Sequence, residues 1–349
     1  MSNQLSQAKD IYTSLINKKI TTIVILLCLI IITLIINLFA GSADFGIKET
    51  LSALVMRGEN DLAKFIIWKL RMPMALAAIV IGAALAVAGC EMQTILRNPM
   101  ASPYTLGISS AASLGAALAI VLKVSLIPVA GHIIVTANSF LFTILAAGAL
   151  NMFAKNKSAS RNSLILFGIA LNFLFSALTQ LLQYLASEES LQTLTFWSFG
   201  SLTRVDWTKL AIISGVFIFV TALFLKNSWK LTAMTTSDET AMSLGIDPKS
   251  LRRRIILLVA LMSATVVSSA GTIGFVGLVA PHISRIIAGE EQRFFIIISA
   301  LIGSFILSIA SILSKVLIKG IILPIGLMTS IIGVPFFTYL IFSGARRNA

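Results

Sequence analysis

Residues 20–39 read ITTIVILLCLIIITLIINLF, an apolar run without a single charged residue. About 20 residues at a rise of 1.5 Å each cross a 30 Å hydrocarbon core, so this run is long enough for one spanning helix. A polar start that includes Lys18 and Lys19 precedes it in place of a small-residue cleavage site. This favours a retained helix over a signal peptide, and it predicts a protein built for lipid.

Similar apolar runs continue along the rest of the chain. Composition agrees, because 57% of the residues are hydrophobic and 12% are charged, against about 25% charged in an ordinary soluble domain. We expect an all-α polytopic membrane protein, with an N-terminal segment 1–19 followed by one transmembrane domain 20–345. The predicted spans, about ten, lie near residues 20–39, 72–92, 104–122, 134–153, 164–186, 209–225, 255–274, 276–288, 294–317 and 326–343.

The net charge of +13 is scattered between the apolar runs. The positive-inside rule explains this distribution better than nucleic-acid binding does, so no nucleic-acid partner is expected. The bias of Lys and Arg favours ten spans over nine. It places both termini in the cytoplasm of a multi-pass inner-membrane protein.

The seventh and eighth predicted spans form one apolar stretch that a single tilted helix could use. Gly271, Gly274, Gly277 and Pro281 argue against one helix, because glycines at this spacing followed by proline continue a helix poorly. The pattern predicts a break at membrane depth. Such a break is tolerated only where protein or a water-filled cavity covers it.

Several kinds of catalytic site are not expected. The sequence contains no Gly-Lys dipeptide and hence no phosphate-binding loop of the Gly-Lys-Ser/Thr kind, so any ATP motor must be a separate chain. Neither His132 nor His282 has a second His at metal-ligand spacing, and Cys28 and Cys90 lie in apolar runs. We therefore expect a transport subunit without enzymatic activity, cofactor or metal site.

Glu91 is the acidic residue predicted at membrane depth, near the inner end of the second span. An ion-coupled transporter usually binds its proton or sodium with such a carboxylate. The predicted position allows Glu91 to reach polar surroundings by snorkelling. A secondary transporter therefore stays open as an alternative.

The largest internal loop, 226–254, is patterned as a docking element. Thr236 with Glu239 predicts a capped short helix that runs to Leu244 and ends at Gly245. Asp247 and Pro248 predict the start of a second short helix. An ordinary connector with positive-inside arginines is the alternative.

The fifth predicted span carries a polar stripe. Asn172, Ser176, Thr179, Gln180 and Gln183 recur at helical spacing and share one face. Such a stripe serves interhelical hydrogen bonding about as often as it lines a translocation pathway. Both interpretations stay open.

A series of short motifs in a fixed order resembles the FecCD family of permeases, which belong to ABC importers for iron-siderophores, haem and cobalamin. The resemblance covers nearly the whole chain from about residue 41. The matching residues are Arg71 and Pro73; Gly82-Ala83-Ala84-Leu85-Ala86, Gly89 and Gln93; Arg97-Asn98-Pro99-Met100-Ala101-Ser102-Pro103 with Leu106-Gly107; Gly168-Ile169-Ala170; Phe196-Trp197 with Gly200-Ser201-Leu202; Ala241 with Leu244-Gly245; Gly271-Thr272-Ile273-Gly274-Phe275-Val276-Gly277-Leu278-Val279-Ala280-Pro281-His282 with Arg285; Leu323-Pro324-Ile325-Gly326; and Gly333-Val334-Pro335-Phe336-Phe337.

The resemblance implies a ten-helix permease of the type II ABC importer kind that works as a pair. Its implied partners are a cytoplasmic ATPase dimer and an extracytoplasmic binding protein, and its implied cargo is a ferric siderophore, with haem or cobalamin as alternatives. The loop 226–254 would hold the coupling helices. The implied coupling residues are Ala241, Leu244, Gly245, Asp247 and Arg252, and the residues that match binding-protein docking positions are Arg71 and Lys315.

This chain departs from the family pattern at its external end. Met74 stands where a second arginine is usual, Ser311 replaces an Asp, Lys315 an Arg, and Ile322 a Glu. These changes weaken the docking charges, so we expect Arg57, Lys64 or Lys69 to substitute. They also favour a heterodimer in which a second permease subunit carries the stronger docking residues.

Overall fold

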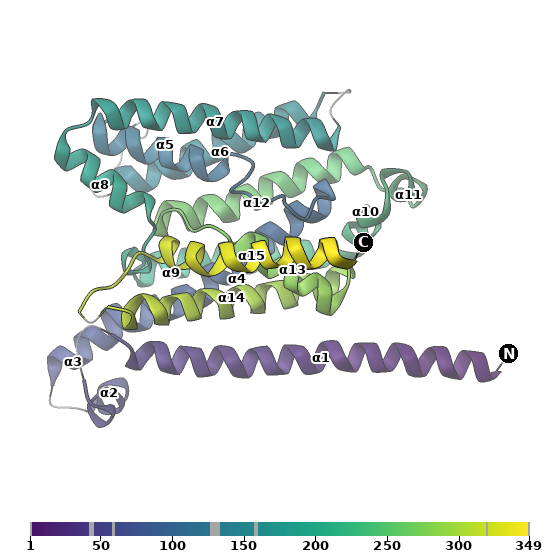
Figure 1. Ribbon diagram of the computed structural model, residues 1–349, viewed down its shortest axis with the longest axis horizontal. Coiled ribbons are helices and arrows are strands. Elements are labelled where there is room, and N and C mark those ends of the chain that lie inside the picture. The colour runs from purple at the N-terminus through teal and green to yellow at the C-terminus, as the bar shows by residue number, and fades with distance from the viewer. Residues whose placement is uncertain are drawn as a thin grey trace.

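Figure 1 shows the computed structural model, a bundle of helices that run side by side. The structure describes residues 2–41, 45–57, 60–125, 133–156, 160–318 and 320–347, and side chains between residues 13 and 338 among them; His132 lies outside these ranges. The long or apolar helices are α1 (Ser2–Phe39), α4 (Met72–Leu96), α5 (Ile108–Val121), α6 (Ile134–Ala154), α7 (Arg161–Leu185), α9 (Trp207–Lys226), α12 (Pro248–Ala270), α13 (Val276–Ala288), α14 (Gln292–Val316) and α15 (Ile325–Arg347). The connecting elements are α2 (Ile47–Leu54), α3 (Asp61–Phe65), the π-helical turn η1 (Ile66–Arg71), α8 (Glu188–Ser198), the 3-10 turn η3 (Leu202–Arg204), α10 (Ser228–Thr236) and α11 (Asp238–Ser243).

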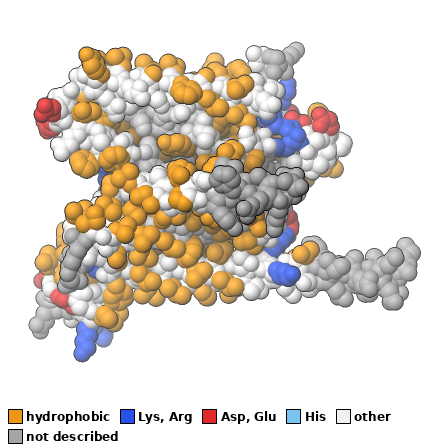
Figure 2. All heavy atoms as spheres, in the orientation of Figure 1, with side chains coloured by type: hydrophobic (Ala, Val, Ile, Leu, Met, Phe, Trp, Pro, Cys, Tyr) orange, Lys and Arg blue, Asp and Glu red, His pale blue; other side chains and the backbone are white. Residues whose placement is uncertain are grey.

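The fold class is the predicted one. Seven helices of the described part are long and apolar enough to cross a membrane, and three further apolar helices, α5, α13 and the start of α15, are shorter. Together they coincide with the ten predicted spans. Figure 2 shows hydrophobic side chains over the middle of the face in view and charged side chains toward its two ends, as a multi-pass membrane protein requires.

The two ends of the bundle differ. Both chain termini, α10 and α11 lie at one end, called the termini end below, and α2, α3 and α8 lie at the opposite end (Figure 1). The predicted N-terminal segment 1–19 belongs to α1, which runs without interruption from Ser2 to Phe39. The helix of the first span therefore continues beyond the apolar run.

Small residues place α4 at the centre of the bundle. In the continuous helix Asp61–Leu96, which includes α4, the most apolar stretch of 18 residues is 83% buried. Helix α4 packs most extensively against α14 and also against α9, α12 and α13. A Cβ atom added at Gly82 would lie 2.3 Å from the carbonyl oxygen of Gly303, and one at Gly89 would lie 1.8 Å from that of Gly277. The helix backbones thus touch at these points, which only glycine permits.

The predicted break between the seventh and eighth spans lies at residues 271–275, where the chain is not helical. Gly271 ends α12 with φ +79°, and Phe275 precedes α13 with φ +65°. Gly274 lies in the break, whereas Gly277 and Pro281 lie inside α13. The sequence pattern therefore marks both the break and the helix that follows it.

Other loops cover the break and bond to it. Ser201 N–H donates to the carbonyl of Ala270 at 2.6 Å, and the Thr272 hydroxyl donates to the carbonyl of Ser198. The chain that enters α15 joins the same site, because Ile325 N–H donates to the carbonyl of Gly200 at 3.1 Å. Protein thus replaces water around this irregular backbone.

The close contact between α4 and α13 generates a stability prediction. Gly89→Ala must push the two backbones apart, and overpacking of this kind costs about 1–3 kcal/mol. We expect a lower unfolding temperature in detergent for this variant. Gly148→Ala in α6 is the matched control, since its Cβ meets nothing within 4 Å and helix propensity favours alanine by about 0.5–1 kcal/mol. Equal unfolding temperatures for the two variants would contradict the contact.

Candidate coupling and translocation sites

The docking element predicted at 226–254 is built from α10, α11 and the start of α12. Ser237, rather than Thr236, caps α11 by accepting a hydrogen bond from Thr240 N–H at 2.9 Å. Asp247 caps α12, with Pro248 in its first turn. The predicted second short helix is the first part of α12, which continues to Ala270 without a break.

The tip between α11 and α12 projects from the bundle at the termini end (Figure 1). Leu244 is 56% exposed, and Gly245 has φ +77° with open space around it. Asp247 is also exposed, whereas Ala241 and Arg252 are buried. The five residues implied for coupling therefore divide into an exposed tip and a buried base.

The buried base is an ion-pair cluster around Asp238. Arg252 Nη2 donates to both oxygens of this carboxylate at 3.1 Å, and Arg161 Nη2 lies 2.8 Å from Oδ1. Burial alone would raise the pKa of the Asp238 carboxyl, but the charges and hydrogen bonds of Arg252 and Arg161 lower it below its usual value. The aspartate is thus an ionised hub between two arginines.

The residues matched to binding-protein docking lie at the opposite end, near the C-terminal end of α1. Arg71 Nη1 donates to the carbonyls of Leu38 and Phe39 at 2.9 and 3.2 Å. Lys315 Nζ donates to the backbone and side-chain oxygens of Asn37 at 3.1 and 3.0 Å. These two cations are 5% and 4% exposed, so they fasten α1 to α4 and α14.

Surface charge at that end comes from other residues. Arg57 and Lys69 are exposed, and Lys64 is half-buried beside Asp61 at 3.0 Å. Arg71, Lys69 and Lys315 also line a cavity of about 410 Å³ that Arg204 and Ile322 share. Among the predicted docking residues, Arg57 and Lys69 are therefore the two that are exposed to solvent.

The polar stripe lies on α7, which forms one edge of the bundle in Figure 1. Thr179 is buried and its hydroxyl donates to the carbonyl of Phe175 at 2.8 Å, within the same helix. Asn172, Ser176 and Gln183 are half-buried. Only 17% of the most apolar stretch of 18 residues in α7 is buried, so most of this helix faces away from the rest of the bundle.

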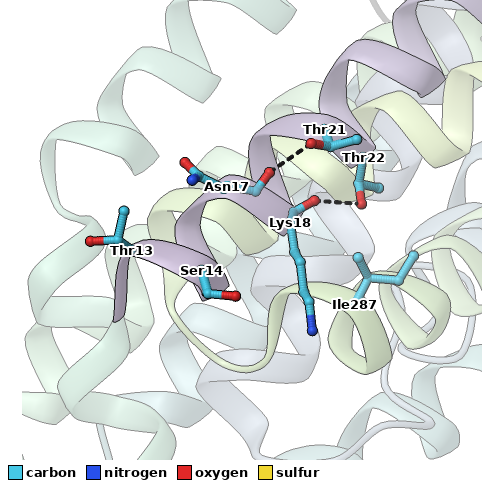
Figure 3. A pocket seen from close by; sticks show the side chains of 7 residues that line it. All are labelled: Thr13, Ser14, Asn17, Lys18, Thr21, Thr22 and Ile287. Atoms are coloured by element: carbon cyan, nitrogen blue, oxygen red, sulfur yellow. Dashed lines mark hydrogen bonds between the residues drawn. The ribbon is translucent and has the colours of Figure 1, made fainter. Parts of the chain in front are cut away.

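A groove lies beside α1 at the termini end (Figure 3). Its volume is about 780 Å³, and its lining residues are Thr13, Ser14, Asn17, Lys18, Thr21, Thr22 and Ile287. The hydroxyls of Thr21 and Thr22 donate to carbonyls of their own helix at 2.9 Å. In the described part of the chain, no three His, Cys, Asp or Glu side chains gather to hold a metal ion.

Comparison with known proteins identifies the family. The model of the FecCD transport family matches residues 29–343. The chain belongs to this family. It is 36% identical over 98% of its length to an ABC transporter permease protein of Methanocaldococcus jannaschii, covering 99% of that protein. It is 32% identical over 91% of its length to a hemin transport system permease protein of Yersinia pestis, covering 96% of that one.

A solved structure extends the likeness of this FecCD chain to three dimensions. It is described as an inward-facing conformation of a metal-chelate type ABC transporter, and it superimposes with a TM-score of 0.81 at 29% identity. The match covers 92% of this chain and 98% of the other. The FecCD chain is thus a transport component of the ABC permease kind.

Glu91 of this FecCD chain differs from its expected position. It is 0% exposed rather than snorkelling, and neither carboxylate oxygen has a hydrogen-bond partner among the described residues. Every residue of α4 from Gly82 to Leu96 is buried, so the Glu91 side chain has no route to polar surroundings. The predicted position of the carboxylate within the span is confirmed, but the predicted polar surroundings are wrong.

The sequence also missed Asp238 and Arg161. They are far apart along the chain and lie in loops or helix starts, where charged residues are ordinary. No local pattern pairs them. Only the folded chain brings the start of α7 close to the start of α11.

The buried carboxylate generates the second prediction. Burying an unpaired charge is costly, and glutamine keeps the shape of the side chain without an ionisable group. We therefore expect Glu91→Gln to leave the unfolding temperature unchanged or raised, and to leave ATP-driven uptake intact. Glu291→Gln is the control, because it breaks the 2.8 Å pair with Lys19 and should lower stability by ~0–1 kcal/mol. Abolished uptake in a folded Glu91→Gln variant would instead favour an ion-coupled transporter.

Proposed function

We propose that this chain is the translocation subunit of an ABC importer that carries ferric siderophores across the cytoplasmic membrane. A separate ATPase dimer would bind the tip at Leu244 and Gly245, and both chain termini would lie on the same, cytoplasmic, side. An extracytoplasmic binding protein would deliver the cargo at the opposite end. The exposed apolar tip, held on a charged and buried base, is the observation that carries this proposal.

The tip has the properties of a docking site for another protein. An exposed leucine beside an open, left-handed glycine can enter a cleft on a partner, and a few well-packed residues carry most of the binding energy of an interface. Asp247 and Pro248 start α12 directly after the tip, so a force on the tip acts on a spanning helix. This arrangement suits coupling better than an ordinary connector.

The second permease subunit is supported by the surface of α7. Its outward face exposes Phe173 and Tyr184, 70% and 87% respectively, beside the half-buried polar stripe. A stripe of Asn172, Ser176, Thr179 and Gln183 would line the pathway if a second subunit covered α7. Because Arg71 and Lys315 are buried and Met74 and Ile322 carry no charge, a non-identical partner with stronger docking residues is favoured over a second copy.

The cargo is argued from chemistry and from relatives. A bulky chelate needs a wide path without tight ligation, and the described residues provide no cluster of metal ligands. Relatives are named for import of hemin, Fe(3+)-citrate and molybdate. Ferric siderophore is our choice among metal-containing cargoes, with haem or cobalamin as the alternatives.

The test of this function is reconstitution in liposomes with the ATPase, the second permease and the binding protein. We expect ATP-dependent uptake, faster with ferric desferrioxamine than with hemin, cobalamin or molybdate. Faster uptake of another compound would change the cargo but keep the importer. Uptake driven by an ion gradient without nucleotide would refute the proposal, and normal uptake without the second permease would refute the heterodimer.

The tip itself generates a third prediction. Leu244→Glu places a charge on the exposed apolar contact, at a cost of about 2 kcal/mol or more, the scale of an interface hot spot. The purified complex should lose its ATPase while the permease keeps its unfolding temperature. Leu191→Glu in α8, 39% exposed at the opposite end, is the control and should retain the ATPase. A Leu244→Glu complex that keeps its ATPase would place docking elsewhere.

A further inference from the structure

The Asp238 cluster joins helices that otherwise pack on different neighbours. Helix α7 packs chiefly against α5 and less against α6 and α4, whereas α11 packs against α10 and α12. Asp238 lies in the first turn of α11, and Arg161 is the first residue of α7. Their 2.8 Å ion pair therefore links the coupling element to the helix that carries the polar stripe.

The same carboxylate reaches the central helix through Arg252. While Nη2 of this arginine holds Asp238, its Nε donates to the carbonyl of Ile95, near the end of α4, at 3.1 Å. A second link runs parallel to it, since Arg97 Nη1 donates to the carbonyl of Thr236. Displacement of α11 thus acts on α4, α7 and α12 together.

Arg252 is buried, whereas Arg161 and Asp238 are half-buried. The Arg252 side chain is 5% exposed, that of Arg161 18% and that of Asp238 28%. Charge-assisted hydrogen bonds are roughly twice as strong as neutral ones, and the burial of Arg252 strengthens its bonds further. Removing the carboxylate would leave Arg252 buried without its counter-charge.

We propose that Asp238 is a positioning residue that makes α7 and α4 move with α11 when the ATPase displaces the tip. The proposal rests on the proposed function, because it requires an ATPase at the tip. Asp238 does not itself contact cargo or nucleotide. It determines whether movement at the termini end reaches the helices that would line the pathway.

The decisive experiment measures whether α7 follows α11. Spin labels are placed at Asn162, the second residue of α7, and at Thr236, which lies two residues before α11, after Cys28 and Cys90 have been replaced by serine. Both labelled positions are exposed. The complex with its ATPase is measured without nucleotide and with ATP plus vanadate. In the otherwise unchanged chain we expect the distance between the labels to stay constant, because the two helices move together.

Asp238→Asn is the test variant, because it removes the charge and keeps the size. The label distance should then shift when ATP and vanadate are added. Glu239→Gln is the matched control one residue along, since Glu239 is exposed and bonds within its own turn, to Ser237. Glu239→Gln should behave like the unchanged chain, and Asp238→Glu should restore the constant distance.

Function gives an independent readout. In liposomes, Asp238→Asn should keep its ATPase and continue to hydrolyse ATP, while uptake of ferric desferrioxamine falls on the order of tenfold, within the usual range of coupling between sites. A purely structural defect would lower hydrolysis and uptake together. The ratio of ATP hydrolysed to chelate carried therefore separates positioning from folding.

Each contrary outcome has one meaning. A constant label distance in Asp238→Asn, a distance that changes in the unchanged chain, or loss of the ATPase from Asp238→Asn would each overturn the proposal. If the unchanged complex carries none of the tested compounds, the proposed function fails. The label distances then still decide whether α7 follows α11.

Discussion

Inside a membrane, a backbone amide or carbonyl without a protein partner has no water to replace it. This constraint explains why the described chain is helical wherever it crosses the bundle, and why its irregular segment at 271–275 is enclosed. The loop after α8 and the chain that enters α15 both bond to that segment. Gly200, Gly271 and Gly326 allow the three backbones to approach, since an added Cβ at each would lie within 2.5 Å of a carbonyl oxygen. The motifs spread along the sequence are therefore parts of one junction.

The sequence predicted the fold because lipid imposes simple rules on composition. Apolar runs of sufficient length gave the ten helices, and the glycines at 271 and 274 gave the interruption between α12 and α13. Capping signals were less reliable, since Ser237 replaces Thr236 as the cap of α11 and α12 has no interruption after its Arg-rich start. A cap depends on which of several adjacent hydroxyls the tertiary structure orients, and local patterns do not contain that information.

For the charged residues, the sequence does not predict what surrounds each side chain in the folded protein. Arg71 and Lys315 were matched to a surface role by their position in motifs, yet their side chains bond to the carbonyls of α1. Glu91 was placed in a span correctly, but its isolation depends on helices remote in sequence. The Asp238 cluster combines the starts of α7 and α11 with the first turns of α12. For each of these residues, packing rather than local pattern decides whether the charge meets solvent, a carbonyl or an opposite charge.

Helix α12 connects the two parts of the molecule that break the helical pattern. It begins at Pro248, directly after the exposed tip, and ends at Gly271, where the enclosed junction begins. At 1.5 Å per residue, its length of about 35 Å spans the hydrocarbon core. Because Arg252 in its first turns also holds α4 and α11, a push on the tip cannot tilt α12 alone. At its other end, the enclosed junction bonds to the loop after α8 and to the chain that enters α15, so movement of α12 would also reach those segments. A single helix between the Asp238 cluster and the enclosed junction is therefore the simplest route by which movement at one face of the bundle would reach the other.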